Sequence, residues 1–465
     1  MSDLTRIDAA LAIELTDGIS QSAALGTAIP AGTEIGLIVR DAIKGQQTMA
    51  DSRPVVFASD QSTLPVSFST SSVFLIKSGD SSSVDAFTRW RTSDPFTIFE
   101  SSLNETDQTL FWDSSLTGSA TSTWLQNQAA IRLRCTTASG DQAIRQTKQY
   151  LTYQPGKSLM VIIAAVMGSL KANVRQRIGY FDANNGLFWE QDGTNLKVVR
   201  RTFVSGSAVD NTVNQSAWNV DKLDGTGVSG ITLDTSKIQL FLIDFGWLGS
   251  GRIRMGFVIA GQIYYCHQFL IGNTLSDVSM SRATLPIRFE ITNTAAAAST
   301  TDLLLEATTV ISEGGYNPAG FVRSISNGTT TKTVSSTLIP LLSLRLKSAN
   351  IRASILPTST ALWVTDNADI QWQVLLNTTL TGASFASVGA NSIAESDTSA
   401  TALSGGELIA SGYTGNAQTF FQNFNSRLRL GATIGGTSDI LTIAAVRIAT
   451  TDATVLSQLE FQEIY

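Results

Sequence analysis

Polar and apolar residues alternate along many short stretches of the chain from about residue 67 onward. Residues 287–292 read Ile-Arg-Phe-Glu-Ile-Thr, and residues 370–374 read Ile-Gln-Trp-Gln-Val. A period of two places apolar side chains on one face of a β-strand and polar side chains on the other. The pattern therefore predicts half-buried strands in antiparallel sheets.

Turn residues separate these stretches at short intervals. The strands expected at 177–181 and 187–190 flank the sequence Asp-Ala-Asn-Asn-Gly at 182–186. An Asn-Gly pair favours positive φ at both central residues of a hairpin turn. A second group of three strands is expected between residues 238 and 269. Successive hairpins of this kind predict a β-sandwich of jelly-roll type.

The same pattern divides the chain into three parts. Residues 1–66 contain apolar residues without a lasting period, so we expect an extended arm that docks on another surface. Residues 67–315 should form a central, jelly-roll-like sandwich. A Gly- and Pro-rich joint at 312–320 leads into residues 316–465, which suffice for a sandwich of immunoglobulin-like size. The expected fold is all-β, with tandem antiparallel sandwiches behind the arm.

Composition then narrows the function. Of the 465 residues 43% are hydrophobic and only 15% are charged, and the formal net charge is −6. Nucleic-acid binding requires a field of Lys and Arg that this balance does not supply. The longest apolar run, residues 159–167, is well short of the ~20 residues that span a bilayer. One histidine and two cysteines are too few for a His-rich or Cys-rich metal site. We therefore expect no metal and no cofactor, and the charge and the short apolar run predict no nucleic-acid or membrane partner.

Candidate catalytic residues are few. His267 follows Cys266 in an expected strand, where neighbouring side chains point to opposite faces and cannot pair. We interpret His267 as a half-buried sheet histidine, and the chain as a protein that is not an enzyme. A glycosidase would need two carboxylates about 5 to 10 Å apart, a spacing that the sequence cannot test. Asp182 with Glu190, and Asp94 with Glu100, are the candidate pairs for that alternative.

Two segments near the start of the sandwich region carry a resemblance to a known family. Residues 54–66 (PVVFASDQSTLPV) and 85–99 (DAFTRWRTSDPFTIF) are similar, in order and spacing, to segments of structural proteins of tailed bacteriophages. Phe57 and Trp90 stand where the family has smaller aliphatic residues. The resemblance covers residues from about 35 to about 315 and implies a component of the virion, without implying any chemistry.

This resemblance implies a fibre, a capsid decoration or a tail or baseplate protein, made in the host cytoplasm and located in the virion. Its expected partners are copies of itself, most simply as a trimer, and other virion proteins. Aromatic and Arg residues of the two segments are the expected assembly contacts, with ordinary domain core as the alternative. They are Val55, Phe57, Leu64, Phe87, Arg89, Trp90, Arg91, Phe96 and Phe99.

Recognition of a host-surface glycan is the alternative function. Jelly-roll sandwiches often carry sugar sites on their loops, an analogy that rests on fold alone. Exposed aromatic rings can stack on the apolar faces of pyranose sugars. The aromatic residues that we expect in this role are Trp189, Trp218 and Trp247.

Overall fold

The computed structural model describes residues 84–86, 94–415, 417–424, 428–448 and 450–465. The arm expected at 1–66, and with it Val55, Phe57 and Leu64, lies outside the described residues. Regular structure in the described part consists of β-strands and three short 3-10 turns, which confirms the all-β prediction. No helix in this part is long and apolar enough to cross a membrane.

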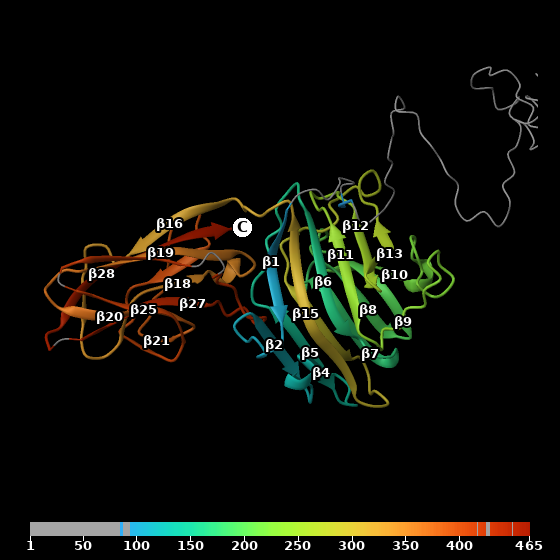
Figure 1. The fold of residues 1–465 in the computed structure, drawn as a ribbon, viewed down its shortest axis with the longest axis horizontal. Coiled ribbons are helices and arrows are strands. Elements are labelled where there is room, and N and C mark those ends of the chain that lie inside the picture. The colour runs from blue at the N-terminus through green and yellow to red at the C-terminus, as the bar shows by residue number, and fades with distance from the viewer. Residues whose placement is uncertain (1–83, 87–93, 416, 425–427, 449) are drawn as a thin grey trace, which may run out of the picture. The chain divides into compact units, whose positions relative to one another are not determined.

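The first sandwich consists of two antiparallel sheets (Figure 1). One has eight strands, in the order β13 (Gln262–Phe269), β12 (Ile253–Ile259), β11 (Gln239–Phe245), β6 (Ser158–Val166), β15 (Thr301–Glu313), β4 (Ala130–Cys135) and β3 (Thr121–Leu125), with β1 (Pro95–Ser102) also pairing with β15. The other has seven, in the order β10 (Val209–Asn214), β9 (Asn195–Thr202), β8 (Gly186–Gly193), β7 (Lys171–Phe181), β14 (Ile287–Asn293), β5 (Gln142–Thr147) and β2 (Trp112–Thr117).

The chain crosses repeatedly between these two sheets, in the jelly-roll manner that the sequence predicts. The late strands β14 and β15 insert between early strands, because β14 pairs with β5 and β7 while β15 pairs with β4 and β6. Alternate residues of both sheets point inward to one hydrophobic core that extends in sequence from Phe99 to Val310. This core therefore closes only when strands distant in sequence have paired.

The second sandwich has a core of its own, between Ile325 and Phe461. One sheet comprises β16 (Gly320–Ser326), β28 (Ala453–Ile464), β19 (Ser354–Val364) and β26 (Thr419–Asn423), with β17 (Lys332–Val334) also on β28. The other comprises β22 (Ala386–Ser387), β23 (Ala394–Asp397), β18 (Ile339–Leu346), β27 (Ile440–Arg447), β20 (Asp369–Leu376) and β25 (Glu407–Gly415), and β21 (Thr379–Thr381) pairs with β24 (Ala402–Ser404).

The turn between β7 and β8 differs from the predicted Asn-Gly hairpin. Asp182 Oδ1 accepts the backbone N–H groups of Asn184 and Asn185, each at 2.8 Å. Positive φ occurs at Gly186 (151°) and not at Asn185. A Cβ at Gly186 would lie 2.0 Å from that of Phe181, so only glycine fits there. The prediction of two central residues with positive φ was wrong because the aspartate side chain closes this turn.

Hydrogen bonds connect the two sandwiches. Ala432 N donates to Lys148 O at 3.0 Å, Ser354 Oγ donates to Tyr150 O at 3.3 Å, and Ile434 N donates to Asp113 Oδ2 at 2.8 Å.

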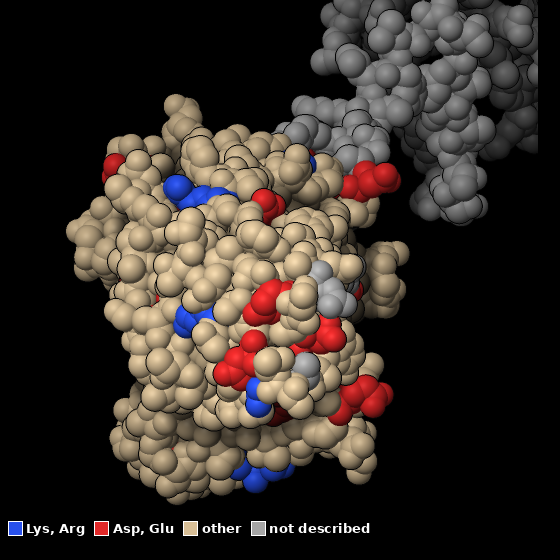
Figure 2. All heavy atoms as spheres, turned by 90° about the vertical axis from the view of Figure 1, so that its left-hand side faces the viewer, with Lys and Arg blue, Asp and Glu red and all other residues tan. Residues whose placement is uncertain are grey.

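Most of the surface seen in Figure 2 is uncharged, and its few basic side chains are scattered. That face is therefore poor in charged side chains, like the chain as a whole.

Candidate ligand-binding cleft

A cleft of about 620 Å3 lies where the two sandwiches meet. Its volume falls within the range of small-molecule sites, about 300–1,000 Å3. The first sandwich contributes Tyr153, Pro155, Trp247 and residues 281–284, and the second contributes residues 348–353 and Tyr465. Hydroxyl, amide and guanidinium groups thus face the same space as three aromatic rings.

The aromatic wall of the cleft is held in a fixed orientation. Trp247 and Tyr153 meet edge to face, with ring centroids 6.0 Å apart and an angle of 83° between their planes. The Trp247 backbone N–H donates to Tyr153 Oη at 3.0 Å, and its indole Nε1 donates to Met280 O at 3.1 Å. Trp247 remains half-buried, whereas Tyr153 is buried. The indole is therefore positioned before any ligand arrives.

A tight turn after β11 presents Trp247. Gly251 N donates to Trp247 O at 2.7 Å, and Leu248 has φ of 38°, which is uncommon for a residue with a side chain. A Cβ on Gly251 would lie 1.4 Å from Gly246 O, so the two ends of the turn approach as closely as glycine allows. Backbone strain of this kind is frequent at ligand-binding turns.

Two arginines line the opposite part of the cleft. Arg352, which follows the 3-10 turn η3 (Ser348–Asn350), forms an ion pair with buried Asp182 across the two sandwiches, Nε to Oδ2, at 3.2 Å. Arg282 is exposed and lines the same cleft. Loss of hydration lowers the pKa of the Arg282 guanidinium below its usual value, and the nearby charge of Arg352 lowers it further.

Of the three tryptophans expected to stack on sugars, only Trp247 lies in the cleft. Trp189 is fully buried, with its ring 5.2 Å from that of Phe241, and Trp218 is 4% exposed with its indole N–H directed to Val213 O. The prediction for Trp189 and Trp218 was wrong because both rings belong to the core of the first sandwich. Neither presents a face to a ligand.

The expected assembly residues divide in a similar way. Phe96 is 45% exposed and stacks on Tyr316 with centroids 5.4 Å apart. Phe99 is buried and contacts Trp112. It therefore belongs to the domain core, the alternative that the sequence left open, and its ring cannot contact another subunit. Phe87, Arg89, Trp90 and Arg91 lie outside the described residues.

Residues 84–86, at the start of the second phage-like segment and directly before it, are buried against the first sandwich. Val84 O accepts from Arg254 Nη2 at 2.6 Å, and Ala86 N donates to Ser158 Oγ at 3.4 Å. Asp85 O accepts from Arg252 Nη2 at 3.3 Å. The sequence predicted assembly contacts in this segment, but it gave no sign that Arg252, directly before β12, and Arg254 of β12 would hold its backbone.

Of the two glycosidase pairs named from the sequence, Asp182 and Glu190 are engaged in ion pairs, whereas Asp94 and Glu100 are exposed side chains. Glu190 binds Arg177 Nε at 2.7 Å and Lys197 Nζ at 3.4 Å, while Asp182 binds Arg352. In the same network, burial raises the pKa of Glu290, but Arg288 and Arg177 outweigh it and leave this pKa below its usual value. A general acid of a glycosidase needs the opposite, a raised pKa.

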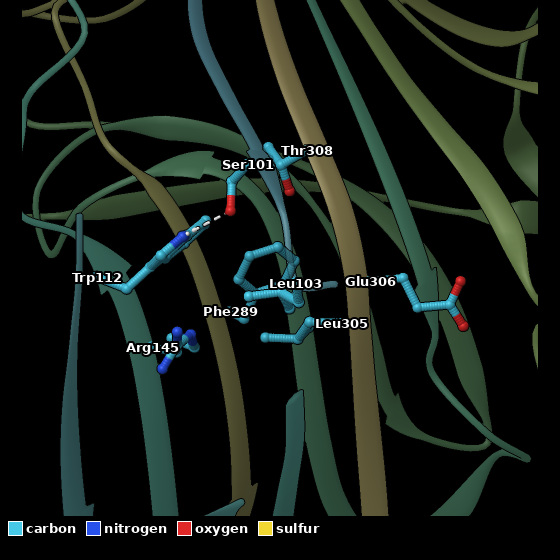
Figure 3. Close-up of a pocket in the computed structure, with 8 residues that line it drawn as sticks. All are labelled: Ser101, Leu103, Trp112, Arg145, Phe289, Leu305, Glu306 and Thr308. Carbon is cyan, nitrogen blue, oxygen red and sulfur yellow. Dashed lines mark hydrogen bonds between the residues drawn. The ribbon is translucent and has the colours of Figure 1, made fainter. Parts of the chain in front are cut away.

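A second cavity, of only about 10 Å3, lies inside the first sandwich (Figure 3). Trp112 Nε1 donates to Ser101 Oγ at 2.9 Å beside it, and burial lowers the pKa of Arg145 to about 10. Burial also raises the pKa of Glu306, but its carboxylate points away from the other lining residues in Figure 3. Such a volume admits about one water molecule, so this cavity is not a ligand site.

His267 is more deeply buried than the sequence predicted, with 6% exposure. Its Nδ1 accepts the Asn219 backbone N–H at 3.4 Å, and burial lowers its pKa to about 4. Cys266 lies in the core, where burial raises the pKa of its thiol. A neutral thiol beside a buried imidazole does not form a nucleophile at neutral pH.

The histidine supplies a direct test of this burial. Because the chain has one histidine, its imidazole resonances in NMR spectra are unambiguous. We expect them to titrate near pH 4 rather than near 6.5. The lowered pKa also means that stability is complete above about pH 6.5 and falls as the pH decreases toward 4, because the unfolded chain binds the proton first. A titration midpoint near 6.5 would contradict the burial of His267.

No protein-family model matches the sequence, and comparison with curated proteins finds no match. Among solved structures, a protein of unknown function from Shewanella oneidensis MR-1 is 11% identical, with a TM-score of 0.32 over 51% of this chain and 93% of that one. A glycosyl hydrolase family protein from Mycobacterium fortuitum is 11% identical, with a TM-score of 0.33 over 46% and 99%. A legume lectin-like domain from Entamoeba histolytica is 8% identical, with a TM-score of 0.26 over 43% and 89%. Similarities at these TM-scores do not indicate a function.

Proposed function

We propose that this chain is a non-enzymatic saccharide-binding component of a bacteriophage particle, and that the saccharide binds in the cleft beside Trp247. The observation that carries the proposal is the pre-oriented indole of Trp247 in a cleft of ligand size. Holding the ring in place before binding reduces the entropy that a complex must lose.

The remaining lining groups suit a sugar. Sugar rings combine apolar C–H faces with a rim of hydroxyls, and thus need an aromatic surface next to hydrogen-bonding groups. In the cleft, Ser281, Thr284, Ser348 and Asn350 provide such groups around Trp247 and Tyr153. Ser281 and Thr284 already bond within the protein, whereas a flat apolar ligand would leave the side chains of Ser348 and Asn350 without partners, at a cost in affinity.

Ion pairing of the carboxylates supports binding without hydrolysis. Asp182 has one cationic partner, and Glu190 and Glu290 have two each. The cationic neighbours of Glu290 hold its pKa below the usual value, the opposite of what a proton donor at neutral pH needs. We therefore place the chain among binding proteins.

The test is direct binding of the purified full chain to host cells and to their extracted surface polysaccharide, measured by calorimetry. We expect saturable binding, and no release of reducing ends during prolonged incubation. Absence of binding to every host polysaccharide would overturn the saccharide role, and release of reducing ends would overturn the non-enzymatic one.

The particle role rests on the resemblance of residues 54–66 and 85–99, supported by the burial of residues 84–86 against the first sandwich. A segment fixed in this way could transmit attachment of the N-terminal arm to the folded body. We propose a homo-oligomer, most simply a trimer, docked on other virion proteins. Immunogold labelling of intact particles should mark a defined position on them, and light scattering should give three times the chain mass. Unlabelled particles, or a monomer in solution, would contradict this role.

A further inference from the structure

Arg282 and Arg352 bring two positive charges to the cleft. Among the described residues, one carboxylate, that of Asp182, pairs with either of them. Asp182 is the carboxylate that pairs with Arg352, at 3.2 Å. Its other oxygen, Oδ1, already accepts two backbone N–H groups of the turn after β7. One aspartate thus serves both the turn and Arg352, and cannot also neutralise Arg282.

Arg282 makes no hydrogen bond or ion pair with any residue in the described part of the chain. Its neighbour Ser281 is anchored, because Asn185 Oδ1 accepts both the backbone N–H and the hydroxyl of Ser281, at 3.0 and 3.1 Å. Tyr180 Oη donates to Ala283 O at 2.8 Å on the other side. The backbone that carries Arg282 is therefore held firmly while its guanidinium stays available.

Cationic groups held close together in a cleft favour an anionic ligand. A guanidinium offers a planar fork of N–H donors that matches the two oxygens of a carboxylate. The fork of Arg282 lines the same cleft as the ring of Trp247. An aromatic surface and a free guanidinium are the two contacts that a sugar ring with a carboxylate substituent requires.

We propose that the saccharide of this cleft is acidic, a sugar that bears a ring carboxylate, with Arg282 binding the carboxylate and Trp247 stacking on the ring. This inference rests on the proposed saccharide-binding function and narrows its ligand class. Arg352 is a positioning residue in this arrangement, because its ion pair with Asp182 fixes the opposite side of the cleft and adds to the positive field.

The experiment uses the full chain on an array of uronate-, sialate- and sulfate-containing oligosaccharides, with each carboxylated sugar beside its carboxyl-reduced, neutral counterpart. Calorimetry then measures the best acidic ligand and its reduced form. We expect the acidic form to bind at least about 10-fold more tightly, as a charge-assisted hydrogen bond implies. The preference should weaken as salt rises and should largely disappear in Arg282→Gln.

Arg134→Gln is the matched control, since Arg134 forms a surface ion pair with Asp302 outside the cleft and its loss should leave the preference intact. Equal binding of acidic and reduced forms would overturn the acidic class while leaving the saccharide role in place. Binding of sulfated sugars but not of carboxylated ones would overturn the carboxylate. Binding of no sugar at all would overturn the proposed function together with this inference. Thermal unfolding of each variant verifies that it is folded.

Discussion

Replacement of Arg254 with methionine should destabilise the protein by about 3–5 kcal/mol, the expected cost of leaving a buried charge without its partner. The Asp244 and Arg254 side chains, which form an ion pair, are 0% and 1% exposed. Asp244 also accepts from Tyr265 Oη at 2.8 Å and Ser158 Oγ at 2.9 Å, so its carboxylate is built into the network. Removal of Arg254 would also remove one hydrogen bond to Val84 O.

Urea unfolding followed by tryptophan fluorescence measures this loss. Arg134→Met provides the control, because the Arg134–Asp302 pair is about one-third exposed and should contribute at most about 1 kcal/mol. A double variant, Arg254→Met with Asp244→Leu, should recover part of the stability because it leaves no buried charge. If Arg254→Met lowers the stability no more than Arg134→Met does, the buried contacts of Asp244 and Arg254 do not hold residues 84–86 in place.

Replacement of Trp247 with alanine should weaken saccharide binding at least about 30-fold, equivalent to the ~2 kcal/mol typical of a central aromatic contact. The indole is a half-buried, pre-oriented ring of the cleft, and Tyr153 lies edge-on to it and cannot take over its position. Trp247→Phe should retain part of the affinity, because a smaller ring still offers a stacking face. Calorimetry with host polysaccharide measures all three proteins.

Trp363→Ala is the matched control for this variant. Trp363 is 46% exposed on β19 of the second sandwich and is not among the residues that line the cleft. We expect its affinity to equal that of the unaltered chain. Equal affinities of Trp247→Ala and Trp363→Ala would place the saccharide elsewhere.

More of the fold than of the candidate site could be predicted from the sequence. Alternation at residues 287–292 and 370–374 indicated strands, and both segments are strands, β14 and β20, with alternate residues in the two cores. The turn at 182–186 was located correctly but its geometry was not, because an Asn-Gly pair does not reveal that Asp182 closes the turn with its side chain. Local sequence thus identified the elements, and side-chain chemistry decided their details.

The tryptophans show why the site could not be predicted. In β8, Phe188 and Trp189 are both fully buried although they point to opposite faces, because Arg177 and Arg201 lie over the Phe188 ring, at 5.3 and 5.1 Å from its centroid. A sequence with apolar residues on both faces does not show which ring is accessible. The cleft, moreover, joins Trp247 and Arg282 to residues 348–353, which only the docking of the sandwiches brings together.

A crystal structure of the full chain with its best-binding oligosaccharide would decide whether the cleft is the saccharide site. We expect a sugar ring against the Trp247 indole, with hydrogen bonds to the polar residues of the cleft. A sugar bound to any other surface, with the cleft beside Trp247 open, would contradict it.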